Sequence, residues 1–278
     1  SVPPMGALLG ALSSLCVGGS EFFGRRSSLV TGVLAVAVVA QGVACLASLA
    51  TVAVVPSAFD PGDLLLGAAS GVGVGFGMVL YLGGVLRSSA TVVAPLVAVL
   101  TVVIPVGYAS VVDEAPSVLV VGGVVVAVLG LVLITSGVRA VGGRRSGLLW
   151  GTGAGMAYGF GLSVLMETDR ASGSWPGSAQ RFVAAIITVA LALSARKAVT
   201  PQRGTRLWAV CSGVLGAAAT LTYIWAVQAD PLPAAVTGAM FPAVSVALGR
   251  VVFGDEVRRS QGFGLLLTLV GVGGVVAG

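Results

Sequence analysis

Among the acidic residues of this sequence, Glu21 has the position that best suits a chemical role. It lies in the segment GGSEFF, within a long apolar stretch. A carboxylate in such a stretch is costly in lipid unless it faces water or a partner. If it reaches a water-filled space it can take up and release a proton, which makes Glu21 a candidate for proton coupling. The alternative interpretation is an ion pair with Arg25 or Arg26, one helical turn away.

Other residues inside apolar stretches could bind a ligand. Arg181 could hold a substrate carboxylate, pin Glu167 or Asp169 across a bundle, or extend to the membrane surface. Gln41 must find hydrogen-bond partners, either on a neighbouring helix or on a ligand. Four aromatic residues could form an apolar wall with polar tips, or serve packing alone. These four are Tyr81, Tyr158, Tyr223 and Trp225.

Three prolines fall inside apolar segments, where a missing N–H frees a backbone carbonyl and permits a bend. Such bends could act as hinges, or could be static kinks that shape a bundle. The three candidate hinges are Pro95, Pro105 and Pro242. Histidine is absent, which removes the commonest general base and metal ligand, so we expect neither an enzyme nor a bound metal or cofactor.

The elements that must position these residues are transmembrane helices. Only 9% of the 278 residues are charged while 56% are hydrophobic, and the mean hydropathy is +1.06. A spanning helix needs roughly 20 predominantly apolar residues. Charges, prolines and glycines divide the chain into ten such spans, which predicts an all-α integral membrane protein. The expected spans are 5–23, 29–54, 64–86, 90–112, 117–137, 147–166, 179–195, 207–227, 233–253 and 261–277.

The two halves of the chain resemble each other. Asp113 and Glu114 align with Asp255 and Glu256, 142 residues later, and the segment from Gly6 matches the one from Gly147 at an offset of 141. We therefore expect two five-helix repeats, 1–140 and 141–278. An odd number of spans per repeat means that the second copy enters the membrane from the opposite side, which predicts inverted repeats.

Positive charge is concentrated on one side of the expected membrane. Of the fifteen cations, only Arg170 and Arg181 fall on the other side. The positive-inside rule places the cation-rich side in the cytoplasm and both termini outside it. The basic residues form no basic face with interleaved aromatics, so nucleic acid is not an expected partner. The thirteen cations of the expected cytoplasmic side are Arg25, Arg26, Arg87, Arg139, Arg144, Arg145, Arg196, Lys197, Arg203, Arg206, Arg250, Arg258 and Arg259.

Four stretches, taken in order and duplicated, resemble the drug/metabolite transporter superfamily, and within it the EamA-type ten-helix members. The resemblance covers nearly the whole chain and implies export or exchange of metabolites, amino acids or drugs. Where members often have tryptophan in the first span, this chain has Cys16 or Val17. The stretches are SSLCVGGSEFFGRRSSL, VVAPLVAVLTVVIP with the later DEAPS, SGSWPGSAQRF and FPAVSVALGRVVFGDEVRRSQGFGLLLTLVGVGG.

Together these features predict a secondary transporter in the bacterial inner membrane. We expect a small-molecule substrate that is neutral, zwitterionic or amphipathic, because few charges lie at mid-membrane. A proton or a counter-substrate would drive transport, since no GxxxxGK[ST] motif for ATP occurs. The transport cavity should lie between spans one to four and six to nine, with the aliphatic spans five and ten outside it. The alternatives are a non-transporting membrane scaffold and an intramembrane enzyme.

Overall fold

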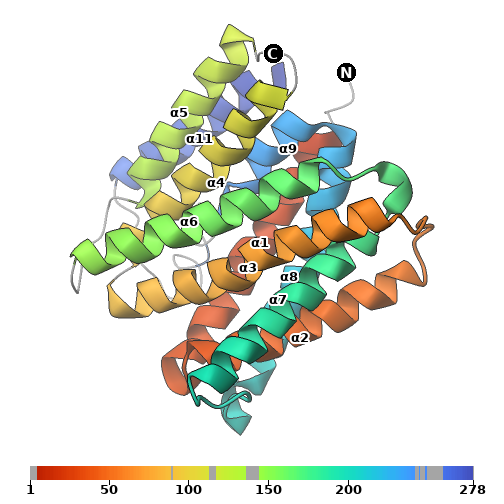
Figure 1. Cartoon of the computed structure of the whole chain (residues 1–278). Helices are drawn as coiled ribbons and strands as arrows, with labels where there is room; N and C mark the ends of the chain where they lie inside the picture. Colours follow the sequence, from red (N-terminus) through yellow and green to blue (C-terminus); the bar gives the residue numbers. More distant parts are fainter. Residues whose placement is uncertain are drawn as a thin grey trace.

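The computed structural model describes residues 5–88, 90–112, 117–135, 144–241, 244, 248 and 259–277, and these are almost entirely helical (Figure 1). Two short 3-10 turns, η1 and η2, precede α7 and α8. The helices are α1 Met5–Thr31, α2 Val33–Val52, α3 Pro61–Arg87, α4 Ala90–Val112, α5 Val118–Thr135, α6 Arg144–Met166, α7 Trp175–Ser194, α8 Arg206–Ala229, α9 Pro231–Gly238 and α11 Arg259–Ala277.

The all-helical membrane architecture expected from the sequence is observed. Six helices, α1, α2, α3, α6, α7 and α8, are long and apolar enough to cross a membrane. The expected spans 90–112, 117–137 and 261–277 coincide with α4, α5 and α11. The span expected at 233–253 begins as α9, and most of its remainder lies outside the described residues. The count of ten spans therefore remains a prediction.

Helix α7 illustrates how these helices distribute their side chains. Its exposed face carries Phe182, Ile186, Val189 and Leu193, spaced by three or four residues. The opposite face is buried and consists of small or polar residues, among them Arg181. Large apolar residues outside and small or polar residues inside suit a helix that faces lipid, where small residues let helices approach closely.

Glycines allow α3 to lie directly against α7. A Cβ on Gly67 would come within 2.2 Å of the carbonyl oxygen of Pro176, and one on Gly71 within 2.5 Å of the carbonyl oxygen of Gln180. Gly75, one turn further, faces Ala184 at 3.2 Å. The regular glycine spacing therefore serves close backbone approach at this interface, as the packing interpretation predicts.

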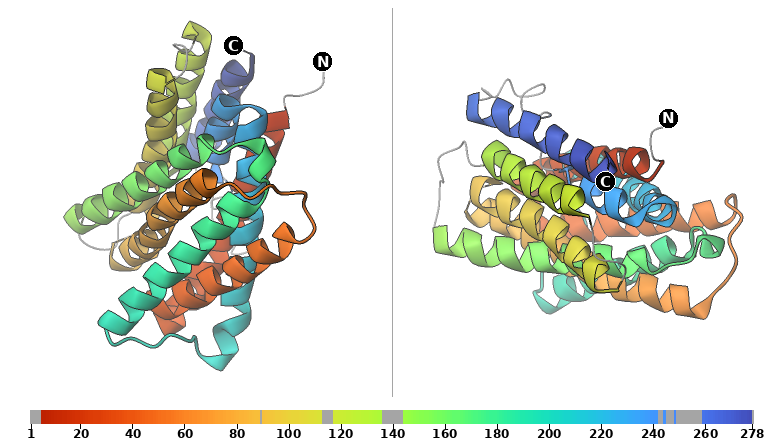
Figure 2. Two further views of the ribbon diagram at one scale, coloured as in Figure 1. Left: turned by 45° about the vertical axis from the view of Figure 1, so that its right-hand side comes forward. Right: turned by 90° about the horizontal axis from the view of Figure 1, so that it is seen from above.

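The helices form a single bundle in which segments far apart in the sequence pack together (Figure 2). α1 packs on α8, α3 packs on α6 and α7, and α2 packs on α7 and α8. α4 packs on α6, while α9 packs on α1. α5 and α11 lie side by side at the edge of the bundle, where each makes its most extensive contact with the other (Figure 1).

Candidate functional site

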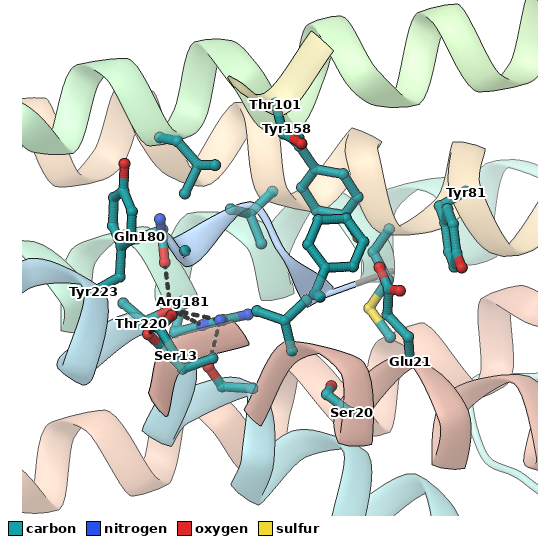
Figure 3. A pocket seen from close by; sticks show the side chains of 18 of the residues that line it. Ser13, Ser20, Glu21, Tyr81, Thr101, Tyr158, Gln180, Arg181, Thr220 and Tyr223 are labelled. Atoms are coloured by element: carbon teal, nitrogen blue, oxygen red, sulfur yellow. Dashed lines mark hydrogen bonds between the residues drawn. The ribbon is translucent and has the colours of Figure 1, made fainter. Parts of the chain in front are cut away.

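A cavity of about 100 Å³ lies in the middle of the bundle (Figure 3). Helices α1 to α4 and α6 to α9, with Phe241 just beyond α9, contribute its described lining residues. No described residue of α5 or α11 lines it, so the expected position of the cavity is confirmed for the described part of the chain. Six of the seven residues singled out for binding or coupling meet there: Glu21, Gln41, Tyr81, Tyr158, Arg181 and Tyr223.

Arg181 forms the polar centre at one side of this cavity. It is only 8% exposed, and its guanidinium donates to three groups on two other helices. Nη1 donates to Oε1 of Gln41 at 3.0 Å, and Nε donates to Oγ1 of Thr220 at 2.9 Å. Nη2 donates to the carbonyl oxygen of Gly216 and also to Thr220. Arg181 therefore joins α7 to α2 and α8, and it neither pins Glu167 or Asp169 nor extends to the surface.

The partners of Arg181 are themselves held by further hydrogen bonds. The Thr220 hydroxyl donates to Oε1 of Gln180 at 2.8 Å, and Nε2 of Gln180 donates to the Ser70 hydroxyl at 2.7 Å. Ser70 then donates to the carbonyl oxygen of Gly161 at 2.6 Å. A continuous chain of hydrogen bonds thus crosses α8, α7, α3 and α6. Such a connected network fixes side-chain orientation, because each member restricts the next.

Gln41 serves both as a contact between helices and as part of the cavity wall. Its oxygen accepts from Arg181, and its Nε2 donates to the sulfur of Met78 at 3.2 Å. It is 2% exposed and lines the cavity. Gln41 therefore links helices, as one of the two interpretations expects, and it also lines the cavity, while a hydrogen bond from Gln41 to a ligand remains a prediction.

Glu21 lies at the other side of the cavity, where it has no comparable partners. It is 9% exposed, and neither carboxylate oxygen has a hydrogen-bond partner of normal geometry among the described residues, although the Tyr81 hydroxyl lies close enough to interact with it. Arg25 is exposed, and Arg26 lies over the ring of Trp208 at 4.6 Å from its centroid. No ion pair joins Glu21 to either arginine among the described residues, so the paired interpretation is not what the structure contains. In Figure 3 Tyr81 lies on the same side as Glu21, with Arg181 on the opposite side.

The rest of the wall is aromatic and aliphatic. Tyr158 lies between the Arg181 and Glu21 sides in Figure 3. The Tyr223 hydroxyl is buried without a partner among the described residues. Apolar side chains close the remaining sides, among them Val17, Val74 and Phe241. The site combines two separated ionisable side chains, Arg181 and Glu21, with aromatic surface and at least one hydroxyl that lacks a partner among the described residues, a combination that suits a ligand of mixed polarity.

Trp225 is the singled-out aromatic residue that the structure places away from the cavity lining. It packs against the buried cluster around Leu165 and Ile224. Tyr223 and Trp225 are two positions apart on α8, which turns them by about 200° around the helix axis. Only one of them can face the cavity, and that one is Tyr223.

The three proposed hinges are not tested by the fold. α4 runs as an unbroken helix from Ala90 to Val112 through both Pro95 and Pro105. Pro105 is buried within it. Pro242 lies outside the described residues. A hinge role for all three remains a prediction.

Several cavity residues were missed by sequence reasoning although a helical pattern could have found some of them. Ser13, Val17 and Ser20 share one face of α1 with Glu21, at spacings of three or four residues. Thr220 lies three residues before Tyr223 on α8, and Gln180 precedes Arg181. Small hydroxyl residues are common inside membrane helices, so their presence alone gives no signal. Their spacing of three or four residues from a charged or aromatic candidate does give a signal.

Comparisons with known proteins identify the fold and no more. Neither protein-family models nor curated protein sequences give a match. Among solved structures, the chain is similar to one described only as "Crystal structure of protein", with a TM-score of 0.80 and 14% sequence identity. The similarity covers 98% of this chain and 98% of that chain. The whole arrangement of helices is therefore shared with a known structure.

Proposed function

We propose that this protein is a secondary transporter that moves small neutral, zwitterionic or amphipathic molecules by alternating access, as an exporter or exchanger. The observation that carries the proposal is the central cavity, which takes lining residues from eight helices along both halves of the chain. A cavity between two halves can open to either side of a membrane if the halves rock against each other. A scaffold protein has no need of such a lined interior space.

The packing of the helices supports two inverted five-helix repeats. Suppose that α1, α2, α3, α4 and α5 correspond in order to α6, α7, α8, α9 and α11. The contact between α1 and α8 then corresponds to the contact between α6 and α3. In the same way, the contact between α2 and α8 corresponds to the contact between α7 and α3. Both members of each pair of contacts occur. The contacts α2 on α7 and α5 on α11 would then each lie on the pseudo-two-fold axis, and both are extensive. This exchange of partners is what an axis in the membrane plane would produce.

One hydrogen bond also supports this symmetry. Gln41 of α2 bonds to Arg181 of α7, 140 residues apart in the sequence. The offset between the two halves is 141, so these residues occupy nearly matching places in the two repeats. Residues related by a two-fold axis meet where the axis passes. The central polar contact therefore lies where the two proposed repeats, 1–140 and 141–278, join.

The cavity's chemistry supports the proposed class of substrate. Arg181 uses much of its donor capacity on Gln41, Thr220 and Gly216, so it offers a ligand little beyond its charge. Glu21 offers an unpartnered carboxylate on the opposite side. A zwitterion could satisfy both sides, and an amphipathic molecule could use the aromatic wall with one polar group. A strongly ionic substrate would need more countercharges than these.

The proposed membrane is the bacterial inner membrane, and the proposed relatives are the EamA-type members of the drug/metabolite transporter superfamily. The sequence resemblance supports the proposed relatives, and the fourteen arginines against one lysine, with heavy use of alanine, glycine and valine, support a bacterial origin. The cation asymmetry supports the orientation in the membrane. It predicts that Arg203, between α7 and α8, lies in the cytoplasm. In a variant with Cys16, Cys45 and Cys211 replaced by Ser, a membrane-impermeant maleimide should label Arg203→Cys only after cells are opened. Labelling in intact cells would reverse the orientation.

Uptake into proteoliposomes tests the proposed activity itself. A panel of radiolabelled amino acids and amphipathic dyes would be followed with and without an imposed pH gradient or internal counter-substrate. We expect at least one class to accumulate, and we expect Ser13→Leu, which adds bulk to the cavity wall, to block it. Accumulation of none, or equal accumulation by Ser13→Leu, would contradict transport through this cavity.

A further inference from the structure

A second cavity lies at one end of the bundle, separate from the central one. It has a volume of about 780 Å³ and lies among the start of α2, the ends of α3 and α7 and the first part of α6. None of its lining residues lines the central cavity. The described lining contains two cations, Arg87 and Lys197, and no acidic residue. Both cations belong to the cation-rich side predicted from the sequence.

Arg87 is held in a fixed position at this cavity. Its guanidinium carbon lies over the ring of Trp150, 4.4 Å from the centroid, and Nη1 donates to the carbonyl oxygen of Gly83 at 3.2 Å. A Cβ on Gly83 would come within 2.7 Å of the Trp150 ring, and one on Gly84 would come equally close to its Cβ. The two glycines thus make room for the tryptophan that supports the arginine. The remaining N–H groups of Arg87 have no partner among the described residues and can bind an anion.

The hydrogen bonds at the C-terminal end of α7 determine where Lys197 lies. Its backbone N–H donates to the carbonyl oxygen of Ala192 at 2.9 Å, and that of Arg196 donates to Leu193 at 3.0 Å. With Arg196 at φ 52°, this is the hydrogen-bond pattern of a Schellman motif. The left-handed residue reverses the chain at the helix end, so Lys197 lines the cavity together with Leu191 and Ser194 of the last turns.

The cations border an apolar surface. The larger apolar residues of the remaining wall are Val33, Leu34, Val79, Leu86 and Leu191. Trp150 lies near the start of α6, where tryptophan commonly marks the level of lipid headgroups. A soluble anion would use the two cations but would leave the apolar wall exposed. An occupant with both an anionic head and hydrocarbon chains would cover both parts.

We propose that this second cavity binds an anionic phospholipid, with its phosphate at Arg87 and Lys197 and the beginning of its acyl chains on the apolar wall. Basic pockets between membrane helices on the cytoplasmic side are suited to acidic headgroups, and that leaflet carries the anionic lipids. Binding there would bridge the ends of α3 and α7 with the first parts of α2 and α6. The inference concerns the protein as a membrane protein, and it does not depend on the proposed transport activity.

Native mass spectrometry of the full chain with phosphatidylglycerol and phosphatidylcholine of equal chain length tests this site. The variant Arg87→Gln/Lys197→Gln removes both cations, and Arg25→Gln/Arg203→Gln removes two exposed cations of the same predicted side that do not line the cavity. Each lost contact should weaken the first phosphatidylglycerol about fivefold, hence roughly 25-fold for the pair, against less than about twofold for the control. Phosphatidylcholine should bind weakly to all three proteins.

The rise in unfolding temperature on adding phosphatidylglycerol gives a second readout, because each variant is compared with its own lipid-free form. The rise should be lost in Arg87→Gln/Lys197→Gln and kept in Arg25→Gln/Arg203→Gln. Equal losses in the two variants, or equal binding of the two lipids to the unaltered protein, would overturn the proposal. Inorganic phosphate that stabilises the protein as well as the lipid does would also overturn it, because the site would then bind a soluble anion.

Discussion

The two sides of the central cavity each contain one buried ionisable side chain, and the two side chains differ in their hydrogen bonding. Arg181 donates to Gln41, Thr220 and Gly216, and these connect to neighbouring helices. Glu21 is equally buried, yet neither of its oxygens has a partner among the described residues. A buried polar group that is hydrogen-bonded contributes to stability, while one without partners costs free energy. The Arg181 side therefore joins helices α2, α7 and α8 to one another. The Glu21 side is available to a ligand or proton that enters the cavity.

This difference predicts opposite effects of two substitutions on stability. Arg181→Ala would leave the acceptors on Gln41, Thr220 and Gly216 unsatisfied, and should lower the free energy of unfolding by about 3 kcal/mol. Glu21→Gln replaces a buried carboxyl group that lacks hydrogen-bond partners with an amide of the same shape, so stability should not fall. Thermal unfolding of both variants in the same detergent measures the contrast. A loss of stability in Glu21→Gln as large as in Arg181→Ala would mean that the two sides do not differ.

A change in the packing of α3 against α7 should disturb the Arg181 side alone. A Cβ on Gly71 would clash with the Gln180 carbonyl oxygen, so Gly71→Ala should lower stability by about 2 kcal/mol. Gly42 on α2 has no atom within 4 Å of such a Cβ, which makes Gly42→Ala the matched control. The control should be neutral or up to about 1 kcal/mol more stable. Equal unfolding temperatures for the two variants would contradict the role of Gly71 in the close packing of α3 against α7.

Much of the fold could be predicted from the sequence because lipid imposes a simple rule. Apolar stretches of about 20 residues separated by charges predict membrane helices. The predicted spans 64–86 and 147–166 lie within α3 and α6, and 90–112 has the bounds of α4. The extension of the first span to Thr31 was not predicted, because Arg25 and Arg26 looked like a loop. Both arginines lie on α1, and Arg26 stacks over the ring of Trp208. Two cations can therefore follow the apolar stretch without ending the helix.

The site residues that could be predicted are those whose side chains are costly to place in lipid. Glu21, Gln41 and Arg181 stood out because polar groups inside membrane helices require partners or water. Gln180, a second amide inside a predicted span, could have been chosen on the same ground as Gln41. Thr220 could be found only by its spacing from Tyr223, because its type alone gives no signal. Which of these residues bond to one another depends on which helices meet, and local sequence does not contain that information. Trp225 could have been excluded, since Tyr223 two positions earlier faces the other way on the same helix.

The free hydroxyl of Tyr223 provides a smaller test of which groups meet a ligand. Tyr223→Phe removes a buried hydroxyl with no partner among the described residues, so stability should change by less than about 1 kcal/mol. If a substrate hydrogen-bonds to that hydroxyl, its apparent affinity should fall about three- to tenfold. Trp225→Phe is the control and should leave affinity unchanged, because Trp225 lies outside the lining. A larger loss of affinity in the control would contradict the assignment of the cavity wall.

Transport by Glu21→Gln in proteoliposomes tests the central claim most directly, namely that the cavity moves a substrate and that the unpartnered carboxylate couples this movement to protons. Gln keeps the shape of the side chain and cannot titrate. For a substrate transported by the unaltered protein, we predict that the variant still binds it and exchanges it down its gradient, but no longer responds to an imposed pH gradient. An unchanged response to the pH gradient in Glu21→Gln would contradict proton coupling at Glu21.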